Sequence, residues 1–171
     1  MIKILFVCYG NICRSPMAEF VMKDLIRQAG MTDEFAIASA ATSREEIGNP
    51  VHHGTRNRLA REGISVEGKR ARQMTKADYA HYDLLIGMES ANIRSMMRIA
   101  GGDVDHKMYR LLDFTDHPRD IADPWYTGDF DSTYADVLAG CRGLLERCME
   151  EHDFPTQINF PKCKKDGTVN T

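Results

Sequence analysis

One short stretch constrains the fold more than any other part of the 171-residue chain. An apolar run, Ile2–Val7, leads directly into Cys8, and an amphipathic helical pattern over Ser15–Gln28 follows within a few residues. Apolar side chains recur in that second segment at the spacing of a helix with one buried face. A buried strand that turns at once into a helix is the first half of a β-α-β unit, so this stretch predicts a parallel sheet.

The same alternation continues along the chain. Further apolar runs predict strands at Phe35–Ala40, Leu84–Met88 and Met108–Leu112. Helical patterns cover Pro50–Arg61, Lys76–His81, Ser90–Ile99 and Ser132–Glu151. Runs of continuous rather than alternating apolar residues are typical of strands covered on both faces. The sequence therefore predicts an α/β fold: a three-layer single domain with a four-stranded parallel sheet flanked by helices.

The two ends of the chain carry different expectations. The length suits one domain, which we place at residues 1–153. Residues 154–171 are mostly polar, contain two prolines and lack helical rhythm, so we expect a C-terminal extension without assigned structure. The irregular stretch Asp113–Asp131 is long for a compact domain, and such loops are usually functional.

Composition excludes several classes of partner. Lys and Arg total 22 against 25 Asp and Glu, a net charge of −3, so we expect neither nucleic acid nor membrane as a partner. The apolar N-terminal run is too short for a signal peptide or a membrane span, so we expect a cytoplasmic protein, although secretion without a signal peptide stays open. We expect a monomer or a weak homo-oligomer.

Five scattered cysteines predict free thiols. The pair His52-His53 has no accompanying carboxylates, and neighbours on a helix point apart, so we expect no metal and no cofactor.

The loop after the first strand carries the chemistry. Ligands of open α/β sheets bind at the carboxyl ends of strands, where backbone N–H groups and a helix N-terminus attract an anion. Cys8 and Arg14 stand six residues apart in that loop. Such surroundings favour a thiolate, and the planar guanidinium can hold two phosphoryl oxygens. The loop predicts a phosphate-binding site with a nucleophile, although a buried strand-end cysteine is also a common core residue.

Neighbouring loop residues fit the same interpretation. Gly10 and Asn11 tolerate the positive φ that an inward-folding loop requires. Asn11 can also hydrogen-bond loop backbone. Ser15 is placed to donate its hydroxyl to the thiolate while capping the helix, with Pro16 at the first helical position.

The full run LFVCYGNICRSPMAE at residues 5–19 closely resembles the signature of the low-molecular-weight protein tyrosine phosphatase family. SAATS at 39–43, DLLIGMESAN at 83–92 and ADPWYTGDF at 122–130 are similar to later segments of that family, in the same order. The resemblance covers roughly the first 150 residues. It implies hydrolysis of phosphotyrosine or small aryl phosphates through a phosphocysteine intermediate.

The resemblance also implies residue roles. Cys8 would be the nucleophile, Arg14 the phosphate-binding cation and Asp123 the general acid and base, although Asp120, Asp129 and Asp131 compete on composition alone. Trp125 and Tyr126 would line a slot for a flat leaving group. The remaining phosphate-binding loop residues are Tyr9, Gly10, Asn11, Ile12, Cys13 and Ser15.

Three positions bear on regulation and specificity. In the family a cysteine at the place of Cys13 can form a reversible disulfide with the nucleophile, whereas the alternative is a buried structural thiol. Ile12 stands where phosphoarginine phosphatases of similar sequence carry Thr, which favours aryl phosphates. Glu45 stands where many members have an aromatic residue.

Other functions remain open at this stage. The loop could bind phosphotyrosine without turnover, although a pure binding module needs no nucleophile or acid. Arsenate reductases share a similar loop but need further cysteines near mid-chain, and none occurs between Cys13 and Cys141. We interpret the basic run 69–72 as a solvated or anion-attracting rim.

Overall fold

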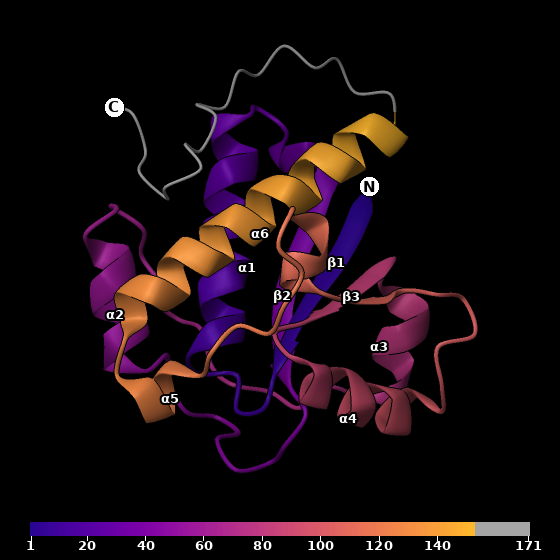
Figure 1. The fold of residues 1–171 in the computed structure, drawn as a ribbon, viewed down its shortest axis with the longest axis horizontal. Helices are drawn as coiled ribbons and strands as arrows, with labels where there is room; N and C mark the ends of the chain where they lie inside the picture. The colour runs from indigo at the N-terminus through magenta and orange to yellow at the C-terminus, as the bar shows by residue number, and fades with distance from the viewer. Residues whose placement is uncertain (153–171) are drawn as a thin grey trace.

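The computed structural model describes residues 1–152, so the expected extension over 154–171 lies outside the described residues. A four-stranded parallel sheet forms the middle layer, with helices on both faces (Figure 1). Its strands lie in the order β2-β1-β3-β4. Their bounds are β1 Ile2–Cys8, β2 Phe35–Ala41, β3 Leu84–Gly87 and β4 Met108–Arg110. The predicted α/β class, strand number and parallel pairing are confirmed.

Helices cover the two faces unequally. Helices α1, α2 and α6 lie on one side of the strands, and α3 and α4 lie on the other (Figure 1). The α-helices are α1 Arg14–Gln28, α2 His53–Ala60, α3 Lys76–His81, α4 Ser90–Ala100, α5 Pro124–Thr127 and α6 Phe130–Glu151, and the 3-10 helices are η1 Thr32–Glu34 and η2 Leu111–Phe114. None of the helices between residues 1 and 152 combines the length and apolar character that a membrane crossing requires.

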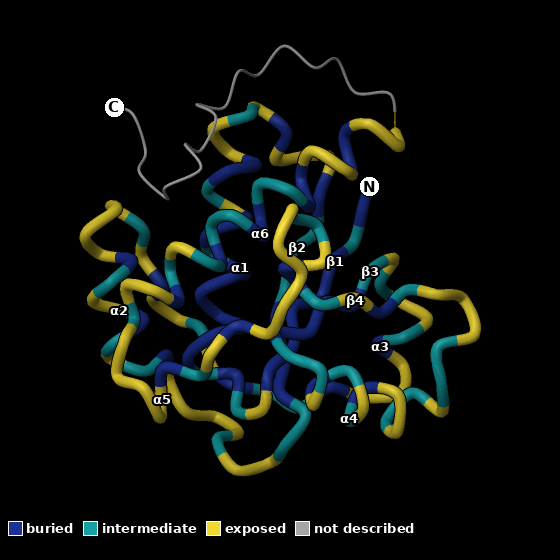
Figure 2. The backbone as a smooth tube through the Cα atoms, in the orientation of Figure 1, coloured by how far each residue is buried: buried dark blue, intermediate teal, exposed yellow. Residues whose placement is uncertain are grey.

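Strand β1 lies at the centre of the core. Ile4, Phe6 and Cys8 face α1 and α6, whereas Leu5 and Val7 face the α3 and α4 side. This alternation explains why the run is continuously apolar: both faces of the strand are covered. The buried segments trace the sheet and the inner faces of the helices (Figure 2).

The region after β3 departs from the predicted boundaries. The strand predicted to reach Leu112 ends at Arg110, because the Arg110 N–H donates to Asp113 Oδ2 at 2.9 Å and turns the chain into η2. Helix α6 packs on η2 through Gly143, where a side chain would overlap the Phe114 carbonyl. Strand β3 likewise ends at Gly87, one residue early.

Two further regions differ from the predicted boundaries, and one predicted helix end is confirmed. The stretch predicted to be irregular up to Asp131 contains the one-turn helix α5 and the start of α6 at Phe130. The helix predicted over Pro50–Arg61 is shorter, since Pro50 instead forms an antiparallel bridge with Arg70. Gly101, with φ 83°, ends α4 in the left-handed conformation, as its position after the helical pattern predicted.

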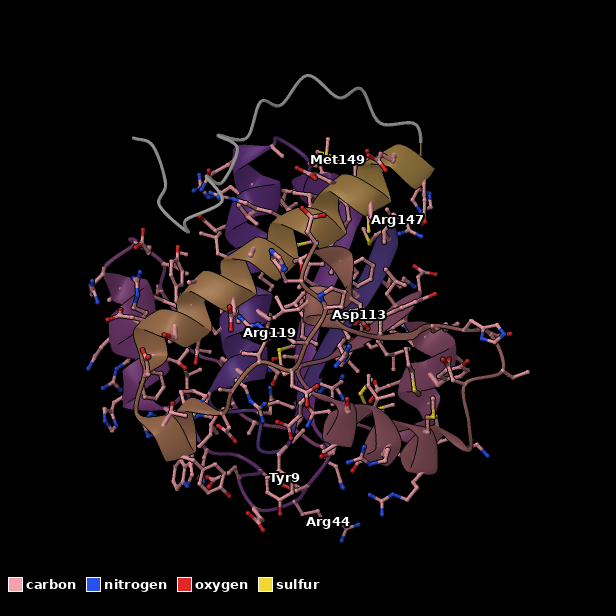
Figure 3. The ribbon with its side chains drawn as sticks, viewed as in Figure 1. Tyr9, Arg44, Asp113, Arg119, Arg147 and Met149 are labelled. Carbon is pink, nitrogen blue, oxygen red and sulfur yellow. The ribbon has the colours of Figure 1, made fainter. Side chains whose placement is uncertain are left out.

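All parallel strands end at the same edge of the sheet. Cys8 is paired with Ala41, and Val7 with Gly87, so the loops after β1, β2 and β3 converge there. Tyr9 and Arg44, from the first two of these loops, lie together at that edge (Figure 3). Arg147, near the end of α6, lies at the opposite end of the molecule (Figure 3).

Candidate active site

The sulfur of Cys8 is surrounded by hydrogen-bonding groups of its own loop. Cys8 is 3% exposed and forms part of the floor of a pocket at the sheet edge. The backbone N–H of Asn11 donates to Cys8 Sγ at 3.3 Å, and Ser15 Oγ lies 3.0 Å from it. Ser15 Oγ accepts from Asn11 Nδ2 at 2.8 Å, and its own proton can point either at the sulfur or at the more distant Ala40 carbonyl, 3.5 Å away. Both contacts stabilise negative charge on sulfur.

The loop backbone turns at Asn11 rather than at Gly10. Asn11 has φ 59°, as predicted, and is fully buried. Gly10 does not adopt positive φ, so that part of the prediction is wrong. The Asn11 side chain fixes the turn through bonds to Ser15 Oγ, to Ser39 Oγ at 2.9 Å and from the Arg72 N–H at 3.2 Å. Its partners therefore come mostly from outside the loop.

Helix α1 starts one residue earlier than predicted. Arg14 is its first residue and Cys13 its N-cap, so Ser15 does not cap the helix and Pro16 is not the first helical residue. The predicted contact of the Ser15 hydroxyl with Cys8 is present. Proline in the first turn is tolerated because those N–H groups have no partner within the helix.

A buried ionic network supports Asn11 from below. Ser39 Oγ donates to Glu19 Oε1 at 2.6 Å, and Glu19 is 4% exposed. Lys69 Nζ lies 3.3 Å from the same carboxylate oxygen and donates to the Ser39 carbonyl at 2.9 Å. The sequence analysis missed this role of Glu19. A carboxylate on the apolar face of the first predicted helix was the feature that could have indicated it.

In the run 69–72, predicted to be a solvated or anion-attracting rim, two of the cations pair with carboxylates of the protein itself. Lys69 belongs to the buried network described above. Arg72 binds both oxygens of Asp78, at 3.0 and 3.1 Å. Arg70 is exposed and donates to the Gly48 carbonyl at 3.3 Å.

Arg14 is buried, and three hydrogen-bond acceptors fix the orientation of its guanidinium group. Its Nη1 donates to Glu89 Oε2 at 2.7 Å and to the Ile121 carbonyl at 2.9 Å, and its Nη2 to Asp123 Oδ2 at 3.3 Å. Burial lowers the pKa of Arg14, but Cys8, Glu89 and Asp123 outweigh it, so the pKa is raised and the cation is held. Among residues 1–152, the Nε–H of Arg14 and one of its two Nη2–H groups have no partner. These two donors can bind two oxygens of a ligand.

Asp123 lines the same pocket as Cys8. It caps α5, because Asp123 Oδ1 accepts from the Trp125 N–H at 3.1 Å, and its other oxygen faces Arg14. The backbone of Asp123 is extended, as the following proline predicts. The aspartate thus lies between the loop and the exposed rings of Trp125 and Tyr126.

The three competing aspartates have other partners and do not line the pocket. Asp120 accepts from Arg110 and Ser90; burial raises its pKa, but these hydrogen bonds outweigh that and lower it. Asp129 caps α6 through Ser132, which lowers its pKa. Asp131 pairs with Arg58 and Arg61, both at 2.9 Å.

The pocket wall carries aromatic and acidic groups. The Tyr9 hydroxyl donates to Glu45 Oε1 at 2.6 Å, and this bond raises the pKa of Tyr9. The predicted loop residues line the pocket except Asn11 and Ser15, which support it from beneath. Its lining consists of Cys8, Tyr9, Gly10, Ile12, Cys13, Arg14, Glu45, Glu46, Asp123, Trp125 and Tyr126.

Cys13 lies beside Cys8 as a second, buried thiol. Burial and the neighbouring Cys8 raise the pKa of Cys13 to about 12. Both cysteines are free in the structure. Cys13 is therefore protonated at neutral pH.

His52 connects the loop that follows β1 to the loop that carries Asp123, a role that the sequence did not reveal. Its N–H donates to the Ile12 carbonyl at 2.9 Å, and its ring stacks on Phe130 with centroids 5.3 Å apart and meets Trp125 edge-on at 5.5 Å. It precedes α2 as the N-cap, so its ring stacks on His53 at 4.2 Å, contrary to the expectation that the two rings point apart. In residues 1–152, no three His, Cys, Asp or Glu side chains gather as a metal site.

The cap makes stability depend on the charge of His52. Its Nδ1 accepts from the Gly54 N–H at 3.0 Å, which requires an unprotonated nitrogen. Burial and His53 lower the pKa of His52, outweighing the opposing effect of Glu46, while Arg56 adds to the lowering. The unfolded chain therefore takes up the proton first as pH falls below about 6.5, and stability falls through the lower folded pKa.

We expect His52→Asn to weaken this pH dependence. Asparagine keeps a cap acceptor but does not titrate, so the free energy of unfolding should fall less between pH 7.5 and 5.5 than in the wild type. Urea unfolding at both pH values measures the difference. His52→Ala is the matched variant, expected to lose about 1 kcal/mol at high pH with the same weak dependence. An unchanged slope in both variants would contradict the assignment.

A thiol at the end of a central strand, a loop N–H that donates to its sulfur and an arginine with two unused N–H donors define a cysteine-dependent phosphatase. A sequence model described as "Low molecular weight phosphotyrosine protein phosphatase" matches residues 3–153. The chain belongs to this family.

Named relatives agree with the family. The low molecular weight protein-tyrosine-phosphatase YfkJ of Bacillus subtilis is 41% identical over 153 residues, which cover 88% of this chain and 98% of that protein. The human low molecular weight phosphotyrosine protein phosphatase is 37% identical over 84% of this chain and 94% of its own length. The crystal structure of YfkJ matches with a TM-score of 0.85 at 42% identity, covering 88% and 96% of the two chains. The structure of Vibrio vulnificus Wzb in complex with benzylphosphonate matches with a TM-score of 0.75 at 27% identity, covering 85% of this chain and 98% of that chain.

Proposed function

We propose that this protein is a protein tyrosine phosphatase that hydrolyses phosphotyrosine and small aryl phosphates through a phosphocysteine. The observation that carries the proposal is the arrangement around Cys8: Ser15 and the Asn11 N–H face its sulfur, and Arg14 presents two unused N–H donors beside it. These groups suit a thiolate nucleophile and the oxygens of one phosphoryl group. Family membership supports the same assignment.

The reaction has two balanced steps. In the first, the Cys8 sulfur bonds to phosphorus, the bond from phosphorus to the phenolic oxygen breaks, and protonated Asp123 gives its proton to that oxygen. In the second, Asp123 takes a proton from water as the water oxygen bonds to phosphorus, and the sulfur leaves as a thiolate. Arg14 and the loop amides hold the oxygens throughout. Protein groups carry every transfer, so the mechanism uses no cofactor.

An aryl substrate fits the pocket wall better than an alkyl one. Tyr9, Trp125 and Tyr126 are exposed around the pocket and can stack on a flat ring. The neighbour Wzb was crystallised with benzylphosphonate, an aromatic phosphonate. Ile12 adds an apolar side chain to the same wall.

Turnover of p-nitrophenyl phosphate in the presence of EDTA tests the proposal. We expect metal-independent hydrolysis and a phosphoryl group on Cys8 after rapid acid quench. Saturable phosphotyrosine binding without turnover would instead make the protein a binding module.

We expect Asp123→Asn to slow hydrolysis most for substrates with poor leaving groups. A nitrophenolate leaves without much help, whereas an alkoxide needs the proton, so kcat/KM should fall on the order of 10²–10⁴-fold for alkyl phosphates and far less for p-nitrophenyl phosphate. The ratio kcat/KM reports the steps up to formation of the phosphocysteine and does not include the hydrolysis of that intermediate. Asp129→Asn is the matched control, since asparagine also caps α6. Equal losses for every leaving group would contradict the acid role.

Cys13 supports a second, redox role for the site. Peroxide would convert the Cys8 thiolate to a sulfenic acid, and the Cys13 sulfur would then displace hydroxide to form a disulfide, releasing water overall. The high pKa of Cys13, about 12, keeps its thiolate scarce and the closure slow. The free thiols of the described cysteines suit a reducing compartment such as the cytoplasm.

A further inference from the structure

Two carboxylates at the pocket wall lack a cationic partner. Glu45 is exposed and Glu46 half-buried, and neither forms an ion pair with any residue between 1 and 152. Tyr9 holds one oxygen of Glu45, and Asn49 Nδ2 donates to Glu46 Oε2 at 2.6 Å. No residue between 1 and 152 donates a hydrogen bond to the second oxygen of either carboxylate.

Nearby cations do not neutralise this wall. Arg14 lies on the pocket floor with its charge shared by Glu89 and Asp123. Arg44 directs its Nε to Gln73 Oε1 at 3.2 Å, and Arg70 donates to the Gly48 carbonyl. Neither Arg44 nor Arg70 lines the pocket. A site that binds a phosphate dianion on its floor thus has a negative wall.

The surface around the opening suits a polypeptide. Exposed aromatic side chains line it, namely Tyr9, Trp125 and Tyr126. Such a surface can contact residues beside a phosphotyrosine that is seated in the pocket. Aromatic faces also attract Lys and Arg side chains.

We propose that Glu45 and Glu46 form a specificity subsite that selects phosphotyrosine flanked by Lys or Arg in a polypeptide. The proposal rests on the proposed phosphatase function and names its substrate class. A flanking cation gains attraction at the wall, and a flanking carboxylate meets repulsion there. Tyr9 is a positioning residue, because its hydroxyl holds the Glu45 carboxylate at the opening.

Two phosphotyrosine peptides of equal length, one with Lys and one with Glu on both sides of the phosphotyrosine, test the subsite. We expect wild-type kcat/KM at low salt to favour the Lys peptide about fivefold, the size of exposed ion-pair effects, and to lose most of that preference at high salt. Glu45→Gln with Glu46→Gln should bring the ratio near one, and Glu45→Lys with Glu46→Lys should invert it. Tyr9→Phe should reduce the preference without changing net charge.

Glu34→Gln is the matched control, because it removes one exposed negative charge just before β2, at the opposite edge of the sheet. This variant should keep the wild-type ratio. Equal rates for both peptides in the wild type, or a preference that survives the double glutamine variant, would overturn the subsite while leaving the phosphatase intact. Absence of turnover of p-nitrophenyl phosphate would instead reject the proposed function.

Discussion

Replacing Cys8 with serine is expected to abolish turnover of p-nitrophenyl phosphate while preserving binding of inorganic phosphate. Serine keeps the size and the contacts to Ser15 and Asn11, but its oxygen is not ionised at neutral pH and attacks phosphorus poorly. We expect a loss on the order of 10⁴-fold or more in kcat, as for other enzymes that lose a covalent nucleophile. Arg14 and the loop amides remain in place, so the dissociation constant of phosphate should change only a few-fold.

Steady-state kinetics and calorimetric titration with phosphate measure the two effects. Cys148→Ala is the control, since it removes another buried thiol, in α6 and outside the pocket. It should retain turnover. Activity that persists in Cys8→Ser would reject Cys8 as the nucleophile, and joint loss of turnover and binding would indicate that the loop had collapsed.

Arg14→Lys is expected to lose most turnover despite keeping a positive charge. An ammonium group cannot reproduce the bonds to Glu89, Ile121 and Asp123 and still present two donors to phosphate. We expect kcat/KM to fall roughly 10³-fold or more, because the lost contacts strengthen in the transition state. Arg14→Ala should lose phosphate binding as well, since it also leaves two carboxylates facing the site.

The same kinetic and binding measurements, with thermal unfolding as a check on folding, distinguish the two Arg14 variants. Arg147→Lys is the control: it makes the same substitution in an exposed pair with Glu151 at the far end of α6 (Figure 3). Full activity in Arg14→Lys would show that charge alone suffices and that the free guanidinium edge has no role.

Local sequence patterns predicted what depends on local sequence. The strands and the longer helices follow from apolar periodicity, and the loop between Cys8 and Arg14 follows from the strand that precedes it and the helix that follows. Helix α5 was missed because four residues are too few to show a helical period. The end of β4 was missed because it depends on one capping contact between Arg110 and Asp113.

Partners from distant parts of the chain could not be predicted in the same way. Glu89 holds Arg14 across 75 positions, and His52 connects two loops that meet only in the folded protein. Nothing in the residues beside Glu89 or His52 indicates these contacts. The family resemblance indicated Asp123 as the acid, and the structure adds that Asp120, Asp129 and Asp131 are engaged elsewhere.

The burial of the cysteines has a consequence for chemical labelling. Neutral electrophiles alkylate thiolates rather than thiols. Burial raises the pKa of Cys148 to about 12 and that of Cys141 further, and Cys13 is protonated for the same reason. Among the four cysteines in residues 1–152, Cys8 is the one whose sulfur faces hydrogen-bond donors on the floor of a pocket open to solvent. An aryl electrophile that mimics phosphate would therefore reach Cys8 through the pocket, whereas burial disfavours the reactive thiolate form of the other three cysteines.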